Sequence, residues 1–106
     1  MAHESVRGFI LREQPLGEAD RLLEIFTADR GLLTAVARGA RRAKSPFVAS
    51  TLVFTFAEFD LFTHKGRHTV DSAEIIESFA DLRSDLDRLI CAAHLAEVFL
   101  DLMRDA

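Results

Sequence analysis

The chain has 106 residues and a formal net charge of −4 at pH 7; 49% of its residues are hydrophobic and 28% are charged. These values are typical of one soluble globular domain, and no apolar segment is long enough to cross a bilayer as a helix. The N-terminus lacks the basic-then-apolar pattern of a secretory signal. The single cysteine, Cys91, excludes intrachain disulfides and cysteine-based zinc sites. We therefore expect a cytoplasmic protein without cofactor, metal or membrane contact.

Residues 6–76 show the period-two alternation of short β-strands, with no helical period among them. The turn residues Pro15, Gly17 and Gly31 separate the first three apolar segments. The five predicted strands are residues 6–12, 21–27, 32–40, 51–64 and 68–76. Five strands within so short a stretch favour a small β-barrel or a sandwich.

The connection after the third predicted strand is strongly basic in an acidic chain. Residues 1–53 contain 8 basic and 6 acidic side chains, whereas residues 54–106 contain 5 basic and 11 acidic ones. No Asp or Glu occurs between Arg30 and Ala57. Such asymmetry between the two halves of a chain is one sequence signal of nucleic-acid contact. The basic residues gathered in this connection are Arg38, Arg41, Arg42 and Lys44.

Phosphate binding is one interpretation of this basic loop (residues 38–44), because Arg and Lys neutralise backbone phosphates and release their counterions. Gly39 and Ala40 leave room for close approach of a ligand to the backbone. Arg12 and Arg21 would extend the patch if the fold brings them beside the loop. Two other interpretations are that the loop is a solvated turn and that it docks an acidic protein partner.

The fourth predicted strand, residues 51–64, changes its apolar face part-way along. Phe54 and Phe56 share one parity, whereas Leu61 has the other. Because strand side chains alternate strictly, we expect a β-bulge or a sharp bend near Ala57. Bends of this kind are common where a small sheet closes into a barrel.

Beyond residue 77 the apolar residues follow helical spacing. Ser78 with Asp81, and Ser84 with Asp87, both match the capping pattern, so we expect a helix to begin at one of them. The apolar face is wider than one small barrel would cover, which makes self-association through this helix a further expectation. The residues that widen the face are Leu95, Val98, Phe99 and Leu102.

The remaining candidate sites have weaker support. Phe47, beside the basic loop, is the best placed of the nine phenylalanines to stack on a base, and the others are expected in the core. His64 and His68 flank a predicted hairpin turn without a strong third metal ligand. Cys91 and His94 lie three apart on the predicted helix, with no orienting acid. Because no catalytic motif occurs, we do not expect an enzyme.

The stretch PLGEADRLLEIFTADRGLLTAVARGARRAKSPF, residues 15–47, resembles the N-terminal part of the RecO family of bacterial DNA repair and recombination mediators. The resemblance depends on an ordered set of short motifs and extends over roughly residues 6–100. These motifs are LGEAD at 16–20, FT at 26–27, Gly31, ARGARR at 37–42 and KS at 44–45, followed by TLVFTFAEFDLF and SAEII.

The resemblance implies an oligonucleotide/oligosaccharide-binding (OB) β-barrel over residues 1–77. It also implies a helical segment over residues 78–106, with one or two helices that begin a larger helical domain. It also implies binding of single- and double-stranded DNA, strand annealing, help in loading the recombinase RecA, and action with a RecR-like partner and with single-strand-binding protein. By position, DNA contact is expected at Arg38, Arg41, Arg42 and Lys44, and also at Arg12 and Arg21. The alternatives are a protein-interaction module whose basic loop docks an acidic partner, and an RNA-binding OB module.

Overall fold

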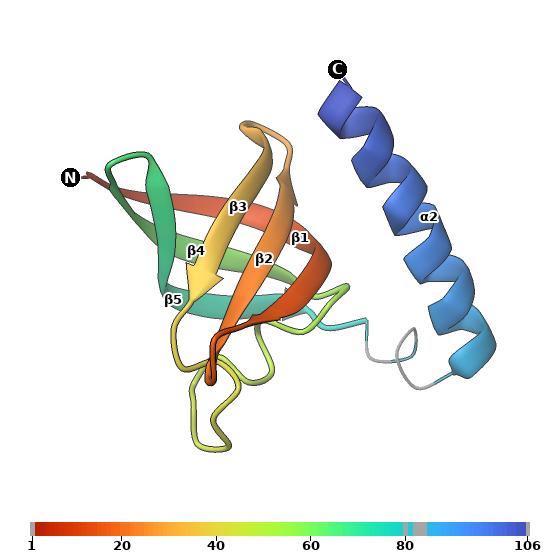
Figure 1. Ribbon diagram of the computed structural model, residues 1–106, viewed down its shortest axis with the longest axis horizontal. Coiled ribbons are helices and arrows are strands. Elements are labelled where there is room, and N and C mark those ends of the chain that lie inside the picture. Colours follow the sequence, from red (N-terminus) through yellow and green to blue (C-terminus); the bar gives the residue numbers. More distant parts are fainter. Residues whose placement is uncertain (1, 80, 82–84, 106) are drawn as a thin grey trace.

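The computed structural model describes residues 2–79, 81 and 85–105. The described residues form five strands that close into a barrel in the order β1-β2-β3-β5-β4, with helix α2 along its side (Figure 1). The elements are β1 (Ala2–Leu16), β2 (Asp20–Thr27), β3 (Gly31–Ala37), β4 (Phe56–His64), β5 (Arg67–Glu77) and α2 (Leu86–Asp105). This arrangement confirms the predicted fold class, a five-stranded OB-type barrel followed by a C-terminal helix.

Strand β1 closes the barrel, because its N-terminal half pairs with β4 and its C-terminal half pairs with β2, both antiparallel. The β1–β2 register slips by one residue between Ile10 and Arg12, so the strand bends where it changes neighbours. The strand predicted at residues 6–12 is only the middle of β1. Its ends escaped the prediction because polar residues such as Glu4 and Glu13 interrupt the apolar alternation.

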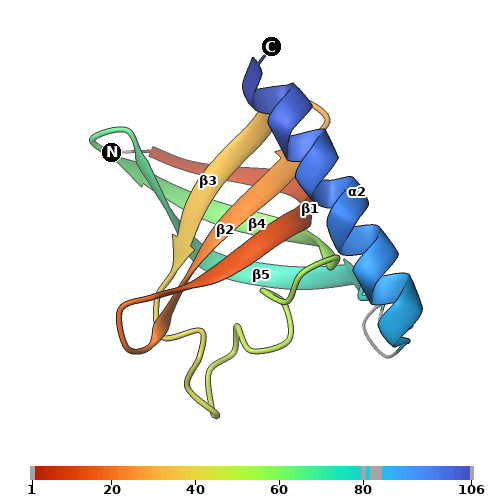
Figure 2. The same cartoon turned by 45° about the vertical axis from the view of Figure 1, so that its right-hand side comes forward.

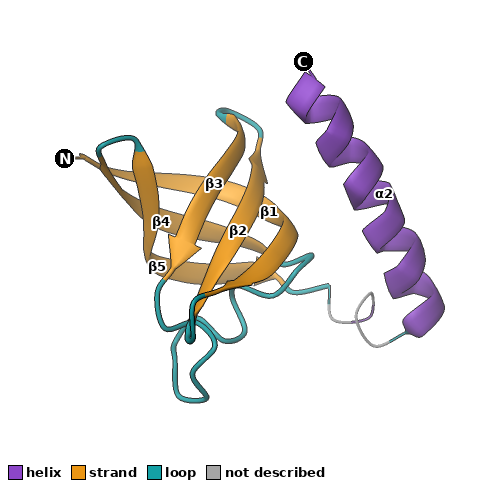
Figure 3. Cartoon of the chain, viewed as in Figure 1, coloured by secondary structure: helices purple, strands orange, loops and turns teal. Residues whose placement is uncertain are grey.

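Strands β3 and β5 are neighbours through a short parallel contact, Ala35↔His68 and Val36↔Thr69. This contact brings the end of β3 beside the hairpin that joins β4 to β5. The connection from β3 to β4, residues 38–55, is long and consists of turns without a strand or helix (Figure 3). It begins with the basic loop, so the basic residues extend from one end of the barrel.

The barrel core follows from strict alternation along the strands. On β4, for example, Ala57, Phe59 and Leu61 are fully buried. Phe59 is the largest of the fully buried side chains, and it packs among residues of every strand. The inward residues contributed by the other strands include Val6, Ile10, Leu23, Ile25, Leu33, Ala35, Ala37 and Val70.

The predicted change of face near Ala57 has a different cause from the one expected. Strand β4 begins at Phe56 and not at residue 51, so Phe54 belongs to the preceding connection. Phe54 has a φ of 70° and is buried, and its N–H donates to the carbonyl of Ile10 at 2.7 Å. The β4–β5 register does shift beside Ala57, but the extra residue lies on β5, at Ile76.

Gly8 permits close approach of β1 and β2. A Cβ atom at this position would lie 2.3 Å from Cγ2 of Ile25, a branched side chain that is fully buried. We expect Gly8→Ala to lower the free energy of unfolding by about 1–3 kcal/mol, measured by urea denaturation. In an Ile25→Ala background the clash is absent, so the same substitution should cost much less. Equal costs in both backgrounds would contradict the steric explanation.

Helix α2 begins with Asp85 as its cap, whose Oδ1 accepts a hydrogen bond from the N–H of Arg88 at 3.1 Å. Of the two caps predicted, Ser84 lies outside the described residues. The helix buries Leu100 against the barrel, whereas Leu95 and Leu102 are 68% and 65% exposed. The wide apolar face is therefore only partly covered, and self-association stays a prediction. No helix in the described part of the chain combines the length and apolar character needed to cross a membrane.

Candidate nucleic-acid interface

The basic loop is fixed to the β1–β2 turn by three hydrogen bonds. Oδ1 of Asp20 accepts from the N–H of Gly39 at 2.7 Å. Arg41 donates from its backbone N–H to the carbonyl of Ala19 at 2.9 Å and from its guanidinium to the carbonyl of Gly17 at 3.0 Å. Gly39 has a φ of 68°, which favours glycine. The LGEAD and RGARR segments thus form one structural unit.

Most of the positive charge on the basic loop forms no ion pair with the described residues, although Glu18 and Asp20 belong to the same unit. Arg38, Arg42 and Lys44 are exposed, and none of them forms an ion pair with any residue that the structure describes. Arg41 is also exposed, although its guanidinium is partly used in holding the turn. Exposed cations without carboxylate partners attract anions with little desolvation cost. The loop is therefore a candidate site for an anionic ligand.

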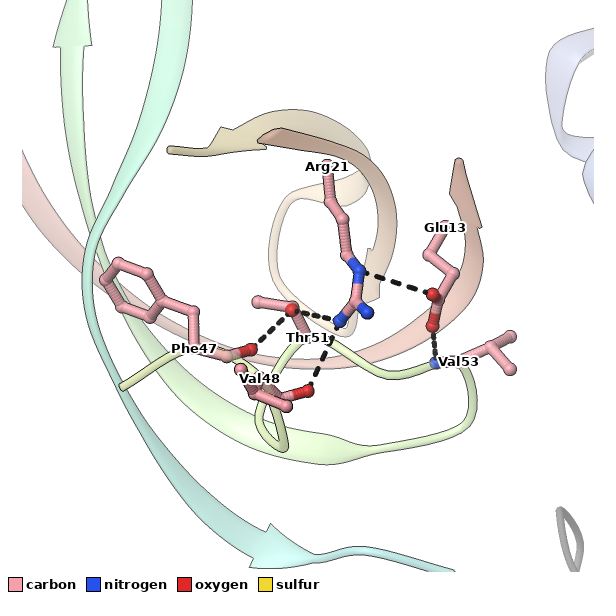
Figure 4. Close-up of polar contacts among 6 residues, drawn as sticks. All are labelled: Glu13, Arg21, Phe47, Val48, Thr51 and Val53. Carbon is pink, nitrogen blue, oxygen red and sulfur yellow. Dashed lines mark hydrogen bonds and ion pairs between the residues drawn. The ribbon is translucent and has the colours of Figure 1, made fainter. Parts of the chain in front are cut away.

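Arg21 lies beneath the β3–β4 connection and not at its surface. Its Nη1 donates to Oγ1 of Thr51 at 2.9 Å and to the carbonyl of Val48 at 3.2 Å, and its Nε lies 3.5 Å from Oε1 of Glu13 (Figure 4). Glu13 also accepts a hydrogen bond from the N–H of Val53. The Arg21 side chain is only 15% exposed. Its contacts hold the connection against β1 and β2.

The structure separates the other predicted residues from this patch. Nε of Arg12 lies 3.9 Å from Oε1 of Glu97, so Arg12 is directed toward α2. Phe47, the residue favoured for base stacking, is partly buried and packs against the barrel core. The six predicted contact residues therefore divide into four on the basic loop, one beneath the segment that follows this loop, and one beside the helix.

A second basic cluster, which sequence reasoning missed, surrounds the β4–β5 hairpin. It lines a groove of about 690 Å³ that includes Arg38, Phe62, His64, Lys65, Arg67 and Asp71. The sequence signal is the HKGRH segment, residues 64–68, which by itself predicts a hairpin turn and two weakly supported metal ligands. Its proximity to Arg38 depends on the parallel contact between β3 and β5, and local sequence does not reveal that contact.

Comparison with known proteins covers the part of the chain that forms the barrel and the basic loop. A family profile described as "Recombination protein O N terminal" matches residues 1–79. The chain belongs to the RecO family. Relatives named "DNA repair protein RecO" cover most of it, which confirms the resemblance stated from the motifs.

Three of these RecO relatives illustrate the extent of the similarity. The protein of Acetivibrio thermocellus is 43% identical over 103 residues, which cover 97% of this chain and 41% of the relative. The protein of Alkaliphilus metalliredigens is 43% identical over 91 residues, covering 86% and 37%. The protein of Rubrobacter xylanophilus is 41% identical over 98 residues, covering 92% and 40%. The chain spans about two fifths of the length of these relatives.

The outer faces of β4 and β5 in this RecO-family barrel carry several carboxylates. Glu58 and Asp60 point outward from β4, opposite Glu74 and Ser72 on β5. The Ser72 hydroxyl donates to Asp60 at 2.6 Å and, together with the hydroxyl of Ser5, holds the pKa of Asp60 below its usual value, so this carboxylate is ionised at neutral pH. Among the described residues, no three His, Cys, Asp or Glu side chains gather as a metal site.

The basic loop and helix α2 lie on different parts of the molecule. The basic loop extends from one end of the barrel, and α2, which carries Asp87, Glu97 and Asp101, lies along the side away from the β4–β5 hairpin (Figures 1 and 2). The basic loop and the hairpin are therefore separated from the carboxylates of the helix.

Proposed function

We propose that this chain is a non-catalytic DNA-binding module of a recombination mediator, and that it holds DNA by its phosphates. The observation that carries the proposal is the set of uncompensated cations Arg38, Arg42 and Lys44 on a loop that the barrel fixes in place. Contacts of this kind bind the backbone without reading sequence. The printed name of the relatives, "DNA repair protein RecO", supports the same conclusion.

The fixed loop matters because a rigid binding segment loses little conformational entropy when a ligand arrives. Arg41 and Asp20 hold its start, and Arg21 holds the connection that follows. Arg21 thus supports binding by positioning, whereas Arg12 lies at the margin of the surface. Cations on one loop can screen the repulsion between two strands, which is the physical requirement for annealing.

The finer parts of the proposal follow from the family. The proposed activities are binding of both single- and double-stranded DNA, strand annealing and assistance in recombinase loading. The proposed partners are a RecR-like protein and single-strand-binding protein, and the proposed location is the nucleoid in the cytoplasm. Residues 1–77 would be the DNA-binding domain, and residues 78–106 would belong to a helical region that contacts protein partners. The exposed Leu95 and Leu102 are consistent with such a contact.

A salt series tests the proposal directly. Binding of the chain to a labelled single strand and a duplex of about 30 nucleotides should weaken steeply with salt, with a logarithmic slope of about −2 to −3 for the single strand if three or four cations each neutralise one phosphate. Fluorescence anisotropy measures both. RNA of the same sequence and an acidic peptide serve as comparison ligands. A folded chain that binds neither DNA at low salt, or that prefers the peptide, would contradict the proposal.

A further inference from the structure

We propose that the groove at the β4–β5 hairpin, here called the hairpin groove, is a base-stacking site for single-stranded DNA. Its lining residues used below are Arg38, Phe62, His64, Lys65, Arg67 and Asp71. The inference rests on the proposed function and adds to it, because a phosphate-binding loop alone does not distinguish single strands from duplexes. The hairpin groove would make that distinction.

The first argument is the aromatic surface of the hairpin groove. Phe62 points outward from β4, away from the core side chain of Leu61. Its ring is stacked with that of His64, with centroids 6.3 Å apart and planes at 23°, and it lies 4.9 Å from the ring of His3 on β1. These rings stand on paired strands, so their positions are fixed without a ligand. An aromatic face of this kind accepts any base by stacking.

The second argument is the arrangement of charge. Arg38, Lys65 and Arg67 border the groove, and none of them forms an ion pair with a residue in the described ranges. The carboxylate of the groove, on Asp71, lies 3.9 Å from Nδ1 of His3. A base on the Phe62 ring would therefore have its flanking phosphates close to cations.

The third argument is the backbone of the hairpin tip. Lys65 and Gly66 have φ values of 52° and 77°, which is the two-residue type I′ turn. The first position of that turn favours Asn, Asp or Gly, and a lysine there is strained. A strained residue that carries the positive charge of the tip is consistent with a functional requirement for that charge.

The fourth argument is continuity with the basic loop. Arg38 directly follows β3, which ends at Ala37, and it opens the basic loop and also lines the hairpin groove. A single strand can therefore stack a base on Phe62, pass Arg38, and continue along Arg42 and Lys44. The bases of a duplex are paired and stacked inside the helix, so a duplex cannot use the Phe62 surface and is held only through its phosphates.

The test is Phe62→Leu, which removes the ring and keeps an apolar side chain. We expect the affinity for single-stranded DNA to fall by about 5- to 150-fold, the effect of losing one stacked base, while the affinity for duplex DNA and the salt slope stay unchanged. Phe56→Leu is the matched control, because Phe56 lies on the same strand outside the groove. A fluorescent base analogue in the strand should be quenched by the wild-type chain and not by Phe62→Leu.

A second variant tests the hairpin tip. Lys65→Asn removes one charge and relieves the strained backbone, so we expect greater resistance to urea together with weaker binding of the single strand. If wild type binds both DNAs and Phe62→Leu keeps its single-strand affinity, or loses affinity for both DNAs equally while folded, this inference is overturned and the basic loop stands. If wild type binds neither DNA, the proposed function itself fails.

Discussion

Arg42→Glu/Lys44→Glu should reduce the affinity of the chain for both single-stranded and duplex DNA by about 100-fold or more, and should flatten the salt dependence. Both side chains are exposed and make no ion pair with a described residue, so the substitutions should leave the barrel folded. Each replaces an attraction to a phosphate by a repulsion. Anisotropy titrations over a salt series measure the affinity and the slope together.

Arg7→Glu/Arg88→Glu is the matched control, since it changes the net charge by the same amount. These side chains are 70% and 66% exposed and lie on β1 and α2, away from the basic loop. We expect the control to bind DNA within a few-fold of wild type, because exposed charges act mainly within a Debye length. An equal loss in both variants would mean that the overall charge, and not the basic loop, controls binding.

Arg21→Met should lower the free energy of unfolding by about 2–3 kcal/mol, because it leaves buried polar groups without their donor. The Glu13 side chain, 24% exposed, loses its cation, and the carbonyl of Val48 and the hydroxyl of Thr51 lose a hydrogen bond. The β3–β4 connection should loosen, so DNA affinity should fall as well. The salt slope should stay unchanged, since a residue that positions the loop neutralises no phosphate.

Arg12→Met is the control for this prediction. The Arg12 pair with Glu97 spans 3.9 Å between side chains that are 41% and 55% exposed, and surface pairs of this kind contribute about 0–1 kcal/mol. Urea denaturation compares the two variants, and hydrogen exchange at the amides of Thr51 and Val53 reports loosening of the connection. Equal stabilities would show that Arg21 is not an anchor, and a reduced salt slope in Arg21→Met would assign it to DNA contact instead.

The sequence allowed the strands with regular alternation to be predicted, because alternation is a local property. Leu23 and Ile25 on β2 are buried as their parity requires. The start of β4 was misplaced because Phe54 continues the apolar pattern in a connection that is not a strand. In that case burial came from packing against β1, which local sequence does not encode.

The candidate site was predictable in its charge and less so in its geometry. The acid-free span marks the basic loop, and the structure shows its cations exposed, whereas their role in binding stays a prediction. The different surroundings of Arg12, Arg21 and Arg38 could not be predicted, because they depend on contacts between residues far apart in the chain. The hairpin groove was missed for the same reason, since the β3–β5 contact joins segments that are separated by the whole of β4.

The separation of the basic end from the acidic helix gives the molecule an electric dipole. A nucleic acid that approaches from the side of α2 meets carboxylates and is repelled, whereas one that approaches the basic loop is attracted once it comes within a Debye length. If the chain binds DNA as proposed, this field would favour approach with the basic loop toward the DNA. In the proposed complex, with DNA at that end, helix α2 and its exposed Leu95 and Leu102 would lie away from the DNA and would be accessible to a second macromolecule.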